Sequence, residues 1–277
     1  MLYKLYDKSK IWFAVAWIIA YCVLMSVGDS LSAKVGLEKS VTLAVGLLLS
    51  GALLLFLNKN ALFDAYGLCP AKVSARLMLF YLPVLLMLSA NLWHGVTLNH
   101  GAVETVLNIL SMLCVGFLEE VIFRGLLFNA MRKDNLKAAV IVSSVTFGIG
   151  HIVNLVNGSG AQLLPNLLQI VYATAAGFMF VMMYLKTDSL IVCIAAHGLF
   201  NAISVFANES NVTTEMQILT CVLLTVITGG YAVYLAWTMK GRESENKFSD
   251  VFCGLCHNST KEGKSLSHSE SDGHKND

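Results

Sequence analysis

Long apolar stretches separated by short polar ones run through the first 240 residues of the chain. A membrane-spanning helix needs about 20 mostly apolar residues, within a range of about 17–25. Eight segments approach this length, so we expect helices at 11–28, 41–57, 77–93, 103–126, 138–156, 163–185, 189–207 and 217–239. The first apolar run is longer than the about 7–15 residues of a signal peptide, so we expect an anchor. The pattern predicts an all-α fold, a polytopic membrane bundle of about eight transmembrane helices.

The composition agrees with this pattern and narrows the class of protein. Hydrophobic residues make up 56% of the chain and charged residues 13%, whereas soluble globular proteins carry about 45–50% and about 25%. So few charges cannot cover the surface of a water-soluble domain of this size, which excludes a cytosolic enzyme and a disordered chain. The formal net charge of +1 also argues against a nucleic-acid partner, because nucleic-acid binders carry a basic surplus.

Lysine and arginine are concentrated on one side of the expected topology. The two chain ends that flank the membrane, together with the loops on the same side, hold 13 Lys and Arg residues. The loops on the other side hold two, Lys34 and Lys39. Cytoplasmic loops of membrane proteins carry the excess of positive charge. We therefore expect both termini in the cytoplasm and an integral, multi-pass protein of a prokaryotic plasma membrane.

The chain changes character at Gly241, where Ser, Lys, Glu, Asp, His and Asn replace the apolar residues. We expect two parts, a membrane core at 1–240 and a disordered, polar cytoplasmic tail at 241–277. Cys253-x-x-Cys256 followed by His257 could bind zinc. A single pair of this kind in a polar tail is a weak signal.

Two adjacent carboxylates and an arginine lie inside the fourth apolar segment. Ionisable residues at membrane depth are costly and usually face a bundle interior or a water-filled cavity. Glu120 and Arg124 are four residues apart and can pair on one helix face. Glu119 points about 100° away from Glu120 and has no cation nearby on the same helix, so it could act as a general base. The alternative is a solvated helix end at the cytoplasmic face.

Polar residues also interrupt the fifth and seventh apolar segments. The fifth carries Phe147-x-x-x-His151, and the seventh carries His197-x-x-x-Asn201, whose two polar residues share one helix face. One histidine inside a membrane is more often a helix–helix hydrogen-bonding residue than a catalyst. Three segments that each bring Glu or His to one slab of the membrane favour a shared site.

Small residues beside these histidines would allow the helices to approach closely. They are Gly148, Gly150, Ala195, Ala196 and Gly198. We therefore expect the polar residues of the three segments around one cavity, opening toward the cytoplasm or into the inner leaflet. Glu120 should instead point away from that cavity, toward Arg124.

The three motifs together resemble those of the CPBP (ABI) family, the type II CAAX prenyl endopeptidases and the bacteriocin-processing or immunity proteins. They are Glu119-Glu120-x-x-x-Arg124, Phe147-x-x-x-His151 and His197-x-x-x-Asn201, in the family's order and spacing. The motif region covers 119–201, within the expected core at 1–240. Each motif alone is weak, whereas three in order on successive apolar segments are a strong signal.

The resemblance implies an intramembrane glutamic endopeptidase without a cofactor. Glu119 and His151 would activate the hydrolytic water, His197 and Asn201 would stabilise the oxyanion, and Glu120 and Arg124 would support the site. Peptide hydrolysis needs a base and oxyanion donors of these kinds. The implied partners are the lipid bilayer and a membrane-associated or prenylated peptide or protein substrate; the oligomeric state stays open.

Two other functions fit the same residues. Two histidines and a carboxylate can bind zinc, so Glu119, His151 and His197 could belong to a zinc-dependent intramembrane metalloprotease. Intramembrane Glu and His networks also carry protons, so the chain could be a non-catalytic transport or immunity protein. A transporter would favour polar residues across the full membrane depth and an inverted repeat, and neither is visible here.

Overall fold

The structure is a computed structural model that describes residues 2–73, 81–157, 162–210 and 212–262, with side chains up to Met239. Ten α-helices lie in these ranges: α1 (Leu2–Lys8), α2 (Lys10–Val35), α3 (Ser40–Lys59), α4 (Leu82–Ser89), α5 (Ala102–Glu120), α6 (Asn129–Met131), α7 (Leu136–Gly150), α8 (Leu163–Thr187), α9 (Leu190–Ser204) and α10 (Thr214–Glu262). Shorter helical segments are η1 (Asp64–Tyr66), η3 (Ala90–Leu92), the π-helix η4 (Val121–Phe128) and η5 (His151–Leu155).

The predicted class, a polytopic all-helical bundle, is confirmed. Among the residues that the structure describes, six helices are long and apolar enough to cross a membrane: Lys10–Val35, Ser40–Lys59, Ala102–Met131, Leu136–Leu155, Leu163–Thr187 and Thr214–Met239. In the described residues the only β-type pairing is one isolated bridge between Val96 and Ala207.

One of the eight expected spans is shorter than predicted: the segment expected at 189–207 forms the helix Leu190–Ser204. The segment expected at 77–93 forms the helix Leu82–Leu92 in its described part, and residues 77–80 lie outside the described ones. The amide of Leu190 donates to the carbonyl of Gly67 at 2.6 Å, and the side-chain amide of Asn91 donates to the carbonyl of Phe200 at 2.7 Å. A helix whose ends bond to neighbouring protein does not need the full thickness of the bilayer.

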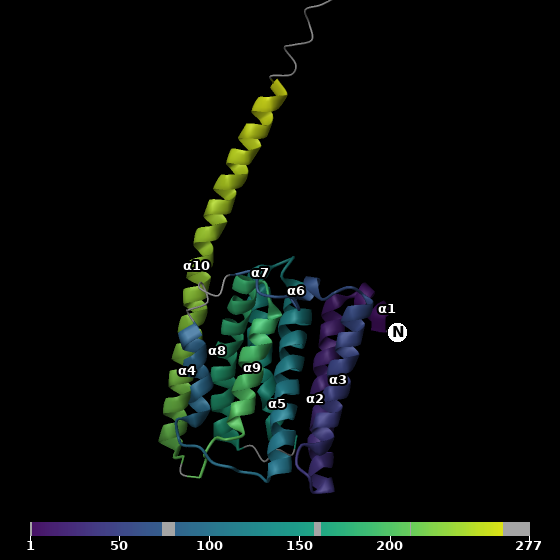
Figure 1. The fold of residues 1–277 in the computed structure, drawn as a ribbon, viewed down its shortest axis with the longest axis vertical. Coiled ribbons are helices and arrows are strands. Elements are labelled where there is room, and N and C mark those ends of the chain that lie inside the picture. Colours follow the sequence, from purple (N-terminus) through teal and green to yellow (C-terminus); the bar gives the residue numbers. More distant parts are fainter. Residues whose placement is uncertain (1, 74–80, 158–161, 211, 263–277) are drawn as a thin grey trace, which may run out of the picture. The chain divides into compact units, whose positions relative to one another are not determined.

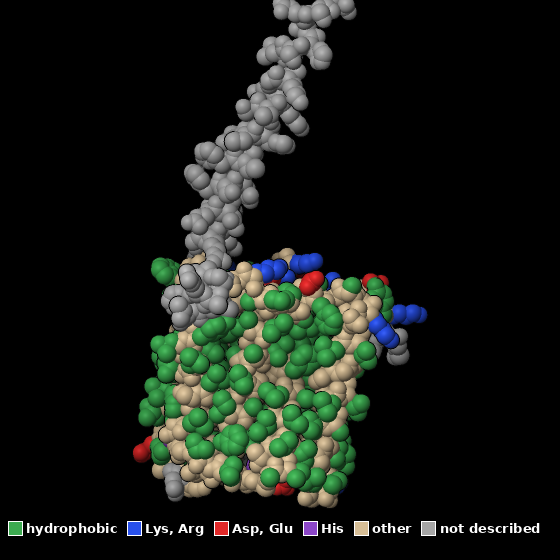
Figure 2. All heavy atoms as spheres, in the orientation of Figure 1, with side chains coloured by type: hydrophobic (Ala, Val, Ile, Leu, Met, Phe, Trp, Pro, Cys, Tyr) green, Lys and Arg blue, Asp and Glu red, His purple; other side chains and the backbone are tan. Residues whose placement is uncertain are grey.

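The helices of the Met1–Val233 unit run side by side between two ends (Figure 1). We call the end formed by residues 2–10, 58–73, 129–137 and 186–190 the basic end. There, Lys72 pairs with Asp188, and Figure 2 shows blue side chains gathered along this end. The other end, the distal end, is formed by 33–40, 93–101, 153–157 and 205–210. His100 and Glu38 pair across it at 3.1 Å, and the amide of Asn208 donates to the carbonyl of Gly95 at 3.3 Å.

The centre of this unit is the π-helix η4, which continues α5. All eight of its side chains are buried, and α2, α7 and α9 pack against it. π-helical segments inside longer helices are frequent at functional sites. The last residues of α5, just before η4, are Glu119 and Glu120, so the change in helix type falls on the predicted site.

The C-terminal residues form a second unit, Tyr234–Asp277. Helix α10 continues through Glu262, and residues 263–277 lie outside the described ones. The side chains of Cys253, Cys256 and His257 are not described either. The predicted boundary at 240, the disordered tail and the weak zinc motif therefore stay predictions.

Candidate active site

Helices α5 and α9 meet at two glycines. A Cβ added to Gly116 would lie 2.6 Å from the Cα of Gly198, closer than any side chain tolerates, so the two backbones are in direct contact. Small residues at helix interfaces allow such approaches in membrane proteins. This contact brings His197, the residue before Gly198, against the end of α5, where the two glutamates lie.

Glu120 lies between Arg124 and His197, whose side chains are completely or almost completely buried. Its Oε1 accepts a hydrogen bond from Arg124 at 3.0 Å and lies 2.8 Å from His197 Nδ1. The side chains of Glu120 and Arg124 are 0% exposed and that of His197 is 6% exposed. As expected, Glu120 pairs with Arg124, and it lines neither of the cavities described below. The glycine contact also brings His197 to the same oxygen that Arg124 binds.

The surroundings of Arg124 explain how a guanidinium is held inside the bundle. It lies 4.1 Å from the centre of the Phe147 ring and 5.3 Å from that of Phe180. It also donates to the carbonyl of Gly177 at 3.3 Å. Ring faces attract cations, so these contacts add to the attraction of Glu120 and hold the side chain in one place.

Glu119 has a different environment from its neighbour. The hydroxyl of Tyr21, in α2, donates to Glu119 Oε1 at 2.6 Å, and His197 Nε2 lies 3.6 Å from Glu119 Oε2. In the described part of the chain, Oε2 is buried and has no hydrogen-bond partner. An unpaired buried carboxylate oxygen costs about 1–3 kcal/mol or more, so this oxygen is poised to bind water or substrate.

His151 begins η5 and is held through its backbone and one ring nitrogen. Its Nδ1 lies 3.1 Å from the carbonyl of Phe147, and its own carbonyl accepts from the Asn166 side chain at 2.8 Å. A carbonyl can only accept, so Nδ1 carries the proton and Nε2 has the free position. The Phe147 ring lies against both His151 and His197, with ring centres 5.4 Å and 5.5 Å away.

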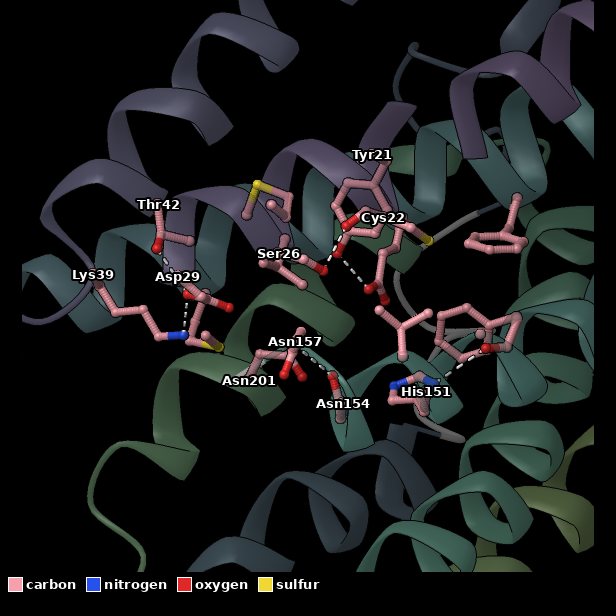
Figure 3. A pocket seen from close by; sticks show the side chains of 18 residues that line it. Tyr21, Cys22, Ser26, Asp29, Lys39, Thr42, His151, Asn154, Asn157 and Asn201 are labelled. Atoms are coloured by element: carbon pink, nitrogen blue, oxygen red, sulfur yellow. Dashed lines mark hydrogen bonds and ion pairs between the residues drawn. The ribbon is translucent and has the colours of Figure 1, made fainter. Parts of the chain in front are cut away.

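Two cavities border these residues. The larger holds about 300 Å³ and is lined by Glu119, His151 and Asn201 among others, as Figure 3 shows for the last two. The smaller holds about 40 Å³ and is lined by His151, His197 and Asn201. The four predicted catalytic residues therefore border two cavities that share part of their lining, with Glu119 on one cavity, His197 on the other, and His151 and Asn201 on both.

Tyr21 is a site residue that the sequence motifs do not reveal. It lies 98 residues before its partner Glu119, in an apolar segment where an aromatic residue looks like ordinary filler. Only its polar hydroxyl at mid-helix could have drawn attention, because a buried tyrosine hydroxyl usually finds a partner.

The proposed metal ligands do not converge on one point in the described residues. No group of three or more His, Cys, Asp and Glu side chains there is close enough to hold one metal ion. Two zinc ligands that each lie about 2.0–2.2 Å from the metal are about 3.3–3.6 Å from each other, and Glu119 Oε2 and His197 Nε2 are 3.6 Å apart. Only the third proposed ligand is missing from this pair, because His151 does not form a group with them and its Nδ1 contacts the carbonyl of Phe147.

The fold and the site together define a class: a polytopic helical membrane protein with carboxylates and histidines buried around an internal cavity. Residues 99–203 match the family model described as "Type II CAAX prenyl endopeptidase Rce1-like". This segment contains all three motifs, so over these residues the chain is similar to the CAAX protease family that the motifs resemble.

A curated relative supports the same family. The chain is 32% identical over 119 residues to a protein of Bacillus subtilis (strain 168) with the printed name "Putative membrane peptidase YdiL". The match covers 40% of this chain and 43% of that protein, so the chain aligns with less than half of its relative's length. No solved structure matches.

Proposed function

We propose that the protein is an intramembrane endopeptidase that hydrolyses a peptide bond of a membrane-associated substrate, with Glu119 as the general base. The observation that carries the proposal is the unpartnered, buried Oε2 of Glu119, which lies beside His197 and borders a cavity. A general base must lie within about 2.6–3.2 Å of the water that it activates. A water on Oε2 would meet that requirement and lie in reach of His151 or a bound peptide.

His197 connects the two glutamates through its two ring nitrogens. Nδ1 lies 2.8 Å from Glu120 Oε1, and Nε2 lies 3.6 Å from Glu119 Oε2. In the proposed mechanism, an N–H at Nε2 donates to the oxygen of the scissile carbonyl as it becomes negative.

His151 and Asn201 complete the proposed chemistry from the cavity walls. His151 has its free Nε2 position on the region where substrate would lie, so it would orient the water with Glu119 and pass a proton to the leaving amine. The side-chain amide of Asn201 would donate a second hydrogen bond to the oxyanion. Glu120 and Arg124 would hold His197 without touching substrate.

The two alternatives receive less support. The proposed zinc ligands do not cluster, as described above. For a transport function, the polar residues would need to continue through the bundle. Beside the site, the larger cavity is instead lined by the buried aromatic side chains of Tyr21, Phe123 and Phe147, which favours a reaction chamber over a transport path.

The test compares membranes that contain wild-type protein with membranes that contain Glu119→Gln, by mass spectrometry of newly formed peptide termini. The amide keeps the shape of the side chain and removes the base, so cleavage should fall by roughly 10²–10⁴-fold while the protein accumulates normally. Glu104→Gln, the same change on the same helix near the distal end, is the matched control and should retain cleavage. Identical termini in wild-type and Glu119→Gln membranes would refute the glutamic mechanism.

A further inference from the structure

Helix α7 ends beside the site, and its end is held by a side chain from the next helix. The α-helix stops at Gly150, and the chain continues from His151 as the 3₁₀ segment η5. Hydrogen bonds in a 3₁₀ turn have poorer geometry than those of an α-helix, so such a turn gains from further contacts. The carbonyl of His151 accepts a hydrogen bond from the side-chain amide of Asn166 at 2.8 Å. The change of helix type and this bond therefore fall on the same residue.

Close packing of α7 against α8 brings Asn166 to this point. A Cβ added to Gly148 would lie 2.9 Å from the Cα of Thr174, and a Cβ added to Gly177 would lie 3.0 Å from the Cα of Ser144. The backbones of the two antiparallel helices are thus in direct contact. Asn166 lies on the first turn of α8, about two turns before Thr174, so it faces the residues that follow Gly148 at the end of α7.

The burial of Asn166 has a cost that packing does not explain. The residue is 2% exposed, and in the described part of the chain its Oδ1 is buried and has no hydrogen-bond partner. A buried acceptor without a partner costs at least as much free energy as one hydrogen bond between neutral groups contributes. An apolar residue of similar size would therefore stabilise this position as well or better. What the amide adds is the hydrogen bond to His151.

The bond from Asn166 gives His151 a second anchor. Nδ1 of the ring lies 3.1 Å from the carbonyl of Phe147, which holds the ring relative to α7, and Asn166 holds the backbone of the same residue relative to α8. His151 borders both cavities, the larger of which is drawn in Figure 3, whereas Asn166 lines neither. A reacting group displaced by about 1 Å can lose about 10²-fold in rate. The second anchor therefore matters for the proposed chemistry although Asn166 does not contact substrate.

We propose that Asn166 is a positioning residue of the active site: its side-chain amide holds the backbone of His151, so that the imidazole faces the bound peptide. This inference rests on the proposed peptidase function for the effect of Asn166 on cleavage, but not for its effect on η5. Because Asn166 acts through His151, its effect on turnover must disappear in a chain that lacks the His151 side chain.

Turnover is measured on purified full-length protein, with a peptide whose cleavage the membrane comparison reveals. Asn166→Ala should lower kcat roughly ten- to a hundredfold and leave KM close to wild type, because Asn166 lines neither cavity. Asn108→Ala is the matched control, since Asn108 is 5% exposed and donates to the carbonyl of Glu104 at 3.0 Å. It removes the same kind of bond about three turns of α5 away from Glu119 and should keep kcat. Wild-type kcat in Asn166→Ala would overturn the inference.

A double variant separates positioning from support of the fold. If Asn166 acts through His151, the chain with both His151→Ala and Asn166→Ala should cleave at the rate of His151→Ala alone, within about twofold. A further loss as large as that caused by Asn166→Ala in the wild-type chain would show that the bond supports only the fold, and the inference would be wrong. Asn166→Leu, which leaves no cavity, replaces Asn166→Ala in both measurements if the latter does not accumulate.

Hydrogen exchange provides a measurement that needs no substrate. Loss of the Asn166 bond should raise the exchange rate of the backbone amides of η5 by roughly tenfold or more, whereas Asn108→Ala should leave that rate at its wild-type value. Unchanged exchange of η5 in the Asn166 variant would contradict the proposal. If wild-type protein cleaves nothing, the proposed peptidase function fails, while the exchange of η5 still decides whether Asn166 holds His151.

Discussion

Two neighbouring glutamates share His197 and differ in their other contacts. Glu120 binds Arg124, is fully buried and lines neither cavity, whereas Glu119 binds Tyr21 and borders the larger cavity. In the described residues, Oε2 of each has no hydrogen-bond partner. Residues next to each other on a helix point in directions about 100° apart, so two neighbouring side chains on one turn lie in different surroundings. This difference separates a reactive carboxylate from one that holds other groups in place.

The Tyr21 hydroxyl should matter for turnover more than for folding. Tyr21→Phe removes one hydrogen bond to a charged group, which is worth about 1.5–3 kcal/mol, and leaves the ring in place. We expect kcat to fall roughly ten- to a hundredfold with a melting temperature close to wild type, measured on purified protein. Tyr6→Phe, which removes the Tyr6–Tyr66 bond of 2.9 Å at the basic end, is the control and should keep kcat. Wild-type kcat in Tyr21→Phe would exclude a role in orienting Glu119.

Arg124 should matter for folding. Arg124→Ala leaves Glu120 without its guanidinium in a fully buried position, and breaking a buried pair in this way costs about 3–5 kcal/mol. We expect low accumulation in membranes and a clearly lower melting temperature, together with loss of cleavage. Lys137→Ala, an exposed change at the basic end, should leave both unchanged. An Arg124→Ala protein with wild-type stability would mean that the cluster is a solvated helix end.

At the scale of elements, the site depends on how closely two helices approach. Glu119 and Glu120 end α5, the π-helix η4 follows at once, and α9 crosses them at the Gly116–Gly198 contact. Glycine costs about 0.5–1 kcal/mol relative to alanine inside a helix, so its presence in α5 needs a packing reason. The backbone contact that places His197 between the two carboxylates is that reason.

Gly116→Ala should therefore disrupt the site although it adds only a methyl group. The new Cβ would lie 2.6 Å from the Cα of Gly198, so α9 must move and His197 with it. We expect a lower melting temperature and at least a tenfold loss of cleavage. Gly51→Ala in α3, where nothing lies within 4 Å of the added Cβ, is the matched control and should be neutral or slightly stabilising. Equal behaviour of the two variants would show that the close approach is not needed.

At the scale of the whole molecule, the purified protein distinguishes the two hydrolytic mechanisms. If Glu119 acts without a metal, a strong chelator should leave cleavage and the melting temperature unchanged, because no ligand–metal bond supports the site. If zinc is bound by Glu119, His151 and His197, the chelator should abolish cleavage and added zinc should restore it. The measurement is the metal content of the protein before and after chelation, with activity measured on the same samples.

The sequence by itself determined those features of the protein that belong to single segments. The length of each apolar run predicts a helix without knowledge of the neighbouring helices. The series of such runs then predicts a bundle of membrane helices. The pairing of Glu120 with Arg124 came from spacing within one helix. The three motifs, each of five or six residues, were sufficient to identify the family that residues 99–203 match.

Only the tertiary structure decided how those segments meet. The contacts of Tyr21 with Glu119 and of His197 with Glu120 join residues 98 and 77 positions apart. The shortness of α9 and the lining of the larger cavity also depend on several helices at once. The hydrophobic pattern shows how much of each helix is apolar. The polar groups that come together are decided by where two helix backbones approach each other, as at Gly116 and Gly198. No pattern within one segment carries that information.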